Sequence, residues 1–168
     1  WAAMNPPATA DVEDDAEVYE GSLPLDPALA DRFPWVLPLP SLAELGREDR
    51  LGLIIGGDLP PEVAPDVADL VAKTREALAD PSREQRDWVA AYVDALVPSL
   101  LESKLGVSGR RAVHLAKGVH AIHAALAVLN LKADLPGAAI LALRYGLPQR
   151  AQGRKIEESR LKAIHREA

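Results

Sequence analysis

The sequence contains no cysteine, which excludes disulfide bonds and thiolate metal sites and fits a reducing compartment. It also has no apolar run that approaches the roughly 20 residues of a membrane-spanning helix. No positively charged start followed by an apolar core and a cleavage site marks a leader. From these absences we expect a cytoplasmic protein that does not engage a membrane.

Aromatic residues are scarce: the 168 residues include three Trp, three Tyr and one Phe. The net charge of −6 is unevenly spread, because residues 1–31 hold eight acidic and no basic side chains, whereas residues 104–168 hold twelve basic and four acidic ones. A basic end can attract nucleic acid, but no aromatic residues alternate with the basic ones to stack on bases. We therefore expect a solvated helical surface and no nucleic-acid partner.

Two motifs of nucleotide hydrolysis are missing as well. The chain has no GxxxxGK[ST] loop to hold phosphates, and no apolar strand ending in Asp-Glu to hold a metal ion and activate water. The stretch LGLIIGGD at 51–58 has glycines but no lysine in register. Residues 1–168 alone should therefore not hydrolyse ATP. No nucleophile triad or carboxylate pair stands out in their place.

With 48% hydrophobic residues the chain can bury a core. At its start, residues 1–4 are typical of the end of a buried strand, which Asn5-Pro6-Pro7 terminates. An acidic loop follows over residues 8–24. The stretch DPALAD predicts one helical turn, capped by Asp26 with Pro27 in first position. Residues 33–39 predict a second short strand, restricted by its two prolines.

From Ser41 onward the apolar spacing is helical. Ser41 with Glu44, and Ser82 with Gln85, each have the spacing of a capping box and predict helix starts. Apolar residues then recur in three- and four-residue steps over 63–78 and 89–100. Pro98 should kink or restart the second of these helices.

Gly106 is well placed to end that helix in a left-handed conformation, and Ser108 to cap the next. The next helix has an apolar stripe that begins at Leu115, and Arg110 falls on a different face, together with His114 and Lys117. Residues 134–148 predict another short helix, and IEESRLKAIHREA a final amphipathic one.

The histidines of residues 109–129 do not predict a metal site. His120 and His123 are three residues apart and could in principle share a metal ion. However, His114 lies on the opposite side from His123, and no carboxylate is on the same helix. We expect no metal ligands in this chain.

Three stretches, taken in order, resemble the second half of a MoxR-type AAA+ ATPase. They are a strand ending in MNP before an acidic loop, LDPALADRF running into a strand, and GVSGRR opening a helix. The resemblance implies a mainly α chain in which residues 1–40 end an AAA+ α/β core with two short strands. Residues 41–168 would form an all-α lid domain with a C-terminal helical extension. The chain would then be a fragment of a longer protein whose phosphate loop and metal ligands lie upstream.

The resemblance also implies roles for three residues. Asn5 matches sensor 1, which would orient the attacking water; it could instead only satisfy the turn before Pro6. Arg32 matches an arginine finger that reaches the ATP of a neighbouring subunit; the alternative is an ion pair with Asp31 or Asp26.

Arg110 matches sensor 2, which contacts nucleotide in its own subunit; it could also be a solvated arginine at a helix start. The helical wheel agrees with the motif in selecting Arg110, because Arg111 turns toward the apolar stripe.

The implied function is that of the sensor and lid portion of a hexameric ATPase, which would use ATP and Mg²⁺ to remodel or chaperone partner proteins. In similar proteins the partners often carry von Willebrand factor A domains. A stand-alone helical interaction module without nucleotide chemistry is the alternative.

Overall fold

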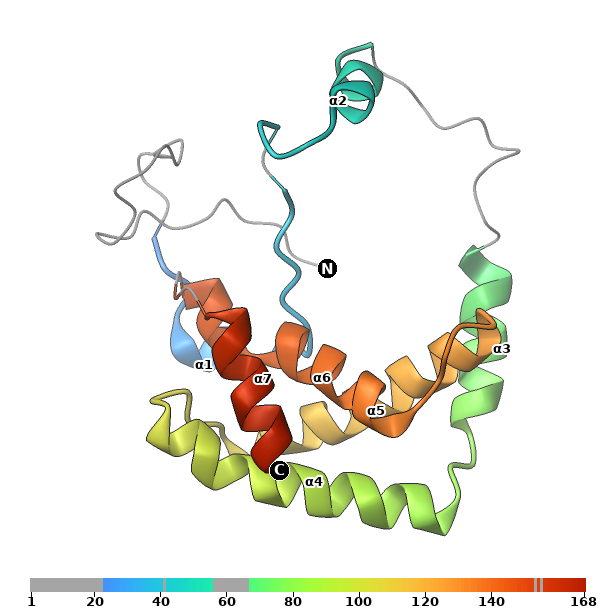
Figure 1. Ribbon diagram of the computed structural model, residues 1–168, viewed down its shortest axis with the longest axis vertical. Coiled ribbons are helices and arrows are strands. Elements are labelled where there is room, and N and C mark those ends of the chain that lie inside the picture. Colours follow the sequence, from blue (N-terminus) through green and yellow to red (C-terminus); the bar gives the residue numbers. More distant parts are fainter. Residues whose placement is uncertain (1–22, 41, 56–66, 153, 155) are drawn as a thin grey trace.

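The computed structural model describes residues 23–40, 42–55, 67–152, 154 and 156–168 (Figure 1). Within these ranges the chain is helical and contains no strand. The helices are α1 Pro27–Ala30, α2 Arg47–Ile54, α3 Val67–Leu78, α4 Arg83–Glu102, α5 Gly109–Val128, α6 Leu135–Gly146, the short 3-10 helix η1 Pro148–Gln152, and α7 Glu158–Glu167. The mainly α class is therefore confirmed for the described residues, whereas the core strands are not found there.

Capping side chains begin several of these helices, as the sequence predicts. Asp26 accepts from two amides of α1, at 2.9 and 3.0 Å, and Pro27 follows it. Ser82 and Gln85 form the complete capping box of α4. Ser108 caps α5, and its side chain accepts from the Arg111 amide three residues on, at 3.0 Å. These local hydrogen bonds satisfy donors that have no partner within a helix.

The end of α4 differs from expectation in one detail, its C-terminal residue. At Pro98, where we expected a kink or a restart, the helix does not restart but runs through to Glu102, and the kink stays a prediction. The helix is followed by Lys104 with a φ of 57°, so Lys104 adopts the left-handed conformation that we expected at Gly106. The Leu105 amide then bonds back to the Leu100 carbonyl at 2.8 Å and closes the end of the helix.

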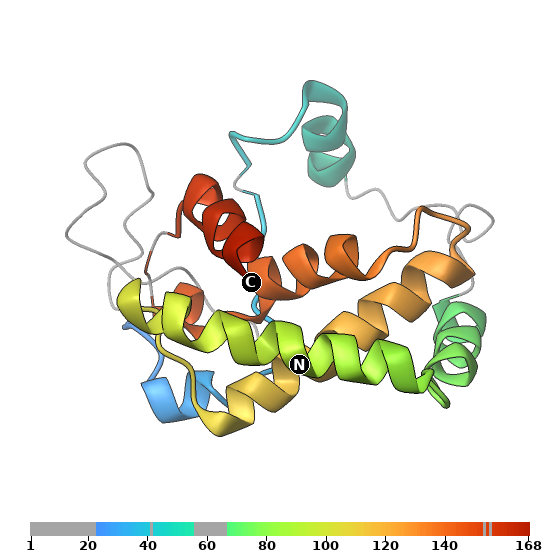
Figure 2. The ribbon, with the colours of Figure 1, turned by 60° about the horizontal axis from the view of Figure 1, so that its bottom comes forward.

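The hydrophobic core lies where α4, α5, α6 and α7 meet, and α3 packs against α5 at the opposite end from α1 (Figure 2). The large apolar side chains that are fully buried come from all four central helices and the residue after α6: Val89, Leu96, Leu100, Val119, Leu143, Leu147 and Leu161. None of the described helices is both long and apolar enough to span a membrane.

Residues 33–39, where we predicted a strand, are irregular backbone. The Val36 amide donates to the Tyr145 carbonyl at 2.8 Å, and the Pro34 carbonyl accepts from the Arg111 side chain at 3.3 Å. Pro34 and Pro38 have no amide hydrogen for a sheet ladder. The strand prediction is therefore wrong, because these backbone groups pair with α5 and the end of α6. The strand predicted at residues 1–4 lies outside the described residues.

Helix α2 stands away from the other helices (Figures 1 and 2). It begins at Arg47 after Gly46 and has no buried residue. The helix start predicted at Ser41 is not found at residues 42–46, which form a turn; Ser41 itself lies outside the described residues. The division into residues 1–40 and 41–168 stays a prediction, since much of the first part is outside the described ranges.

Candidate functional site

The structure brings two of the three predicted site residues to neighbouring places. Arg32 lies directly after α1, and Arg110 lies in the first turn of α5. Both side chains are exposed, and neither makes an ion pair or side-chain hydrogen bond with another described residue. Asn5 lies outside the described residues, so its position relative to the two arginines stays a prediction.

The residue that follows Arg110 is a buried arginine. Arg111 is 0% exposed, although it follows Arg110 directly in the chain. Its Nη2 donates to the Ala30 carbonyl at 3.1 Å, and its Nη1 donates to the Gly146 carbonyl at 2.9 Å. Ala30 and Gly146 end α1 and α6, where unpaired carbonyls give a helix its negative end. The guanidinium therefore joins the C-termini of two helices to the N-terminus of a third.

Asp31 supplies the counter-charge. Its Oδ1 accepts from Arg111 Nε at 3.2 Å, and its Oδ2 accepts from Ser108 Oγ at 2.6 Å. Ser108 Oγ also accepts from the Arg111 amide at 3.0 Å, so one hydroxyl both caps α5 and holds the carboxylate. We call these three residues the Asp31–Ser108–Arg111 cluster. It links the residue before Arg32 to the residue after Arg110.

The electrostatics of the cluster favour an ionised Asp31. Burial by itself would raise the pKa of this carboxyl group, but the hydrogen bonds from Ser108 and Arg111 and the charges of Arg111 and Arg110 outweigh burial. The pKa of Asp31 is therefore below its ordinary value. The influence of Arg110 also indicates that its charge is close to the cluster.

The alternative interpretation of Arg32, an ion pair with Asp31 or Asp26, is wrong for the described residues. Both oxygens of Asp31 are bonded to Ser108 and Arg111, and Asp26 uses its side chain to cap α1. The Arg32 amide instead donates to the Leu29 carbonyl at 3.0 Å, so its backbone is held while its side chain stays exposed.

His114 lies one turn beyond Arg110 and Arg111 on α5. Burial lowers the pKa of His114, and the neighbouring charge of Arg111 lowers it further. Its Nδ1 is buried without a hydrogen-bond partner among the described residues. The basic face predicted on α5 therefore includes a histidine that favours its neutral form.

Sequence reasoning missed the cluster, although a signal for it existed. On a helical wheel, Arg111 lies toward the apolar stripe of α5. A guanidinium group on a core face requires both a counter-ion and hydrogen-bond acceptors. The Asp31–Arg111 pairing joins positions 80 residues apart, and no local spacing reveals it. The wheel predicted the burial of Arg111 but not its partner.

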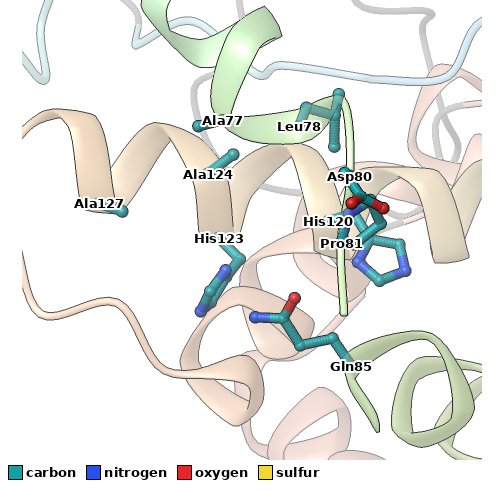
Figure 3. Close-up of a pocket in the computed structure, with 9 residues that line it drawn as sticks. All are labelled: Ala77, Leu78, Asp80, Pro81, Gln85, His120, His123, Ala124 and Ala127. Atoms are coloured by element: carbon teal, nitrogen blue, oxygen red, sulfur yellow. The ribbon is translucent and has the colours of Figure 1, made fainter. Parts of the chain in front are cut away.

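A separate pocket of about 130 Å³ lies between α3, α4 and α5 (Figure 3). It is lined by Ala77, Leu78, Asp80, Pro81, Gln85, His120, His123, Ala124 and Ala127. Burial lowers the pKa of His120, as do the nearby His123 and Arg86. No group of three or more His, Asp or Glu side chains that could hold a metal ion occurs in the described ranges. His120 is ten residues from Arg110 on α5, or ~15 Å along the helix, so this pocket is not part of the arginine site.

The site thus offers two exposed guanidinium groups, each next in sequence to one member of a buried and hydrogen-bonded ion pair. Comparisons with models of protein families, with curated proteins and with solved structures gave no match to this chain.

Proposed function

We propose that this chain is the sensor and lid portion of a MoxR-like AAA+ ATPase, which couples ATP hydrolysis to remodelling or chaperoning of partner proteins. One observation carries the proposal beyond the sequence resemblance. Arg32 and Arg110 are exposed at adjoining ends of α1 and α5, and neither is neutralised by a described carboxylate. A guanidinium group that forms no ion pair with a neighbouring carboxylate can bind phosphate oxygens instead.

The cluster explains why these two arginines stay free. Asp31 is the acidic side chain next to Arg32, and its charge also acts on Arg110. Its two oxygens accept from Ser108 and Arg111, and its ion pair is with Arg111 and not with either exposed arginine. The buried cation thus takes up the negative charge that would otherwise compete with a nucleotide.

In the proposed mechanism Arg32 contacts the ATP of a neighbouring subunit and stabilises the charge on the transferred phosphoryl group. Arg110 contacts the nucleotide of its own subunit and couples the lid to it. Asn5 orients the attacking water. The ligands of Mg²⁺ and the phosphate loop come from sequence upstream of residue 1, the assembly is a hexameric ring in the cytoplasm, and von Willebrand factor A domain proteins are its clients.

The test is ATP turnover by the complete ring-forming protein carrying Arg32→Ala. We expect the variant to bind ATP and assemble normally but to lose about 10³-fold or more in turnover, the range known for fingers supplied by another chain. Arg47→Ala, which removes an exposed arginine on α2, is the matched control and should leave turnover unchanged. Near-normal hydrolysis by assembled Arg32→Ala rings contradicts the proposal.

A helical interaction module without nucleotide chemistry is the second candidate, and the apolar surface of α2 favours it. Leu53, Ile54 and Ile55 are 63, 70 and 80% exposed. Exposed apolar side chains that gather on one element are typical of protein-binding surfaces. This candidate predicts cooperative thermal unfolding of residues 1–168 alone and no phosphate loop in the native sequence before residue 1. Finding that loop would exclude it.

A further inference from the structure

The two arginines of the proposed function are each joined by a peptide bond to one half of the buried ion pair. Arg32 follows Asp31, and Arg110 precedes Arg111. We propose that the Asp31–Ser108–Arg111 cluster is a positioning device that couples Arg32 to Arg110, so that the cation facing the neighbouring subunit moves together with the lid. This inference rests on the proposed function and adds the residues that transmit its regulation.

The segment that carries Arg32 depends on the cluster for its position. Helix α1 has four residues, and a helix this short is not stable by itself. Its last carbonyl, from Ala30, and the next side chain, Asp31, both bond to Arg111. On either side of α1, the Leu25 amide bonds to the Ala151 carbonyl at 3.2 Å and the Val36 amide to the Tyr145 carbonyl. Arg111 is thus the side chain of α5, the helix of Arg110, that makes hydrogen bonds to this segment.

Because Arg111 is charged and buried, its hydrogen bonds to Asp31 and to the carbonyl groups should form or break together. A guanidinium that is 0% exposed needs its carboxylate and its carbonyl acceptors together, because an unpaired buried charge is strongly unfavourable. Small shifts of α5 should therefore carry α1 with them instead of breaking the pair. If the lid tilts when a nucleotide binds at Arg110, the bonds from Arg111 to Ala30 and Asp31 would displace Arg32 as well.

Asp31 and Arg111 are positioning residues and not catalytic ones. Arg111 directs its bonded nitrogens to Asp31 and to three carbonyls inside the molecule, and has no exposed surface for a phosphate. Asp31 is negatively charged and would repel a triphosphate. Any effect of these residues on turnover must therefore act through Arg32 or Arg110.

A double-mutant cycle on the complete ring-forming protein tests the coupling. Asp31→Asn should lower kcat about 10²-fold, the loss that a displacement of ~1 Å produces, and leave the KM for ATP nearly unchanged. In the Arg32→Ala background the same substitution should have no further effect on kcat. An equal loss in both backgrounds would show that Asp31 acts only on the fold, and would overturn the inference but not the proposed function. Unchanged turnover in Arg32→Ala alone would overturn both.

A second variant covers the case in which Asp31→Asn does not fold. Ser108→Ala removes the hydroxyl from Asp31 and the cap from α5 but keeps the ion pair. Ser82→Ala is the matched control, because it removes the equivalent cap from α4 and Ser82 does not contact Asp31. The hydrogen bond to Asp31 is worth about 1 kcal/mol, which corresponds to about 5-fold in rate. We therefore expect kcat to fall about 5-fold in Ser108→Ala and to stay unchanged in Ser82→Ala. Equal effects of the two substitutions would refute the coupling.

Discussion

Arg111 is a permanently charged side chain that is buried away from solvent. The loss of stability on breaking its ion pair should therefore depend on whether Arg111 or Asp31 is removed. The guanidinium is 0% exposed, whereas the side chain of Asp31 is 18% exposed. If the arginine is lost, water can reach the remaining carboxylate. If the carboxylate is lost, the cation stays buried with neutral acceptors alone. We therefore expect the fold to be more sensitive to the charge of Asp31 than the partial exposure of this residue would suggest.

Asp31→Asn tests this asymmetry. The substitution should lower the free energy of unfolding by about 3 kcal/mol at pH 7, at the low end for a broken buried pair, because the amide oxygen still accepts a hydrogen bond. Chemical denaturation of the chain measures the loss. Asp26→Asn is the control, since asparagine caps a helix as well as aspartate does. A loss in Asp31→Asn no larger than in Asp26→Asn would contradict the expectation.

The same pair sets a pH dependence with a definite sign. The pKa of Asp31 is lowered in the folded chain, so its contribution to stability is present above the unfolded value of about 3.9 and is lost as the pH falls through the lower folded pKa. The stability difference between the wild type and Asp31→Asn should therefore be constant near neutral pH and narrow below about pH 3.9. A gap that persists undiminished at the lowest accessible pH would show that the charge of Asp31 is not its cause.

At the scale of helices, the sequence predicts the helix starts, because these depend on side chains close by in the chain. Asp26 with Pro27, Ser82 with Gln85, and Ser108 each mark a helix start where the structure has one, because a cap acts within three residues of itself.

The sequence does not reveal which residues far along the chain supply the hydrogen-bond partners and counter-ions that a segment needs. An extended, proline-bearing stretch at 33–39 fits a strand locally, but its carbonyls and amides pair with helices that lie far along the chain. The same limit applies to the site: the exposure of Arg110 and the burial of Arg111 follow from helical periodicity. The identity of Asp31 as the counter-ion requires the tertiary fold.

The contact between the 33–40 segment and α5 gives the element-scale prediction. Gly118 faces the ring of Trp35, and a Cβ there would lie 2.8 Å from the Trp35 ring atom Cη2. Gly118→Ala should therefore push the indole away and lower the free energy of unfolding by about 1–2 kcal/mol, because the cost of overpacking exceeds the gain in helix propensity. Denaturation and the tryptophan fluorescence of the folded chain report the two effects.

Gly52→Ala is the matched control for this prediction, because it is the same change inside a helix. A Cβ at Gly52 meets no atom within 4 Å, so the substitution should not lower the stability or alter the fluorescence. Equal behaviour of the two variants would show that Trp35 is not held against α5.

Over the whole molecule, stability should be concentrated in the helices that share the core. α4, α5, α6 and α7 contribute its fully buried side chains, and α5 contacts three other helices. In contrast, every described residue of α2 has a solvent-exposed or half-exposed side chain. A helix of eight residues has little stability without tertiary packing. The molecule should therefore open locally at α2 long before the core unfolds.

Hydrogen exchange of the backbone amides tests this difference directly. Amides of α2 should exchange nearly as fast as those of an unstructured peptide, whereas central amides of α5 should exchange at least about 10³-fold more slowly, as the stability of an ordinary domain requires. Equal protection of the two helices would mean that the apolar residues Leu53, Ile54 and Ile55 are covered in solution. Repeating the exchange at lower protein concentration would then distinguish a second copy of the chain, whose protection is lost on dilution, from packing within one chain, whose protection is not.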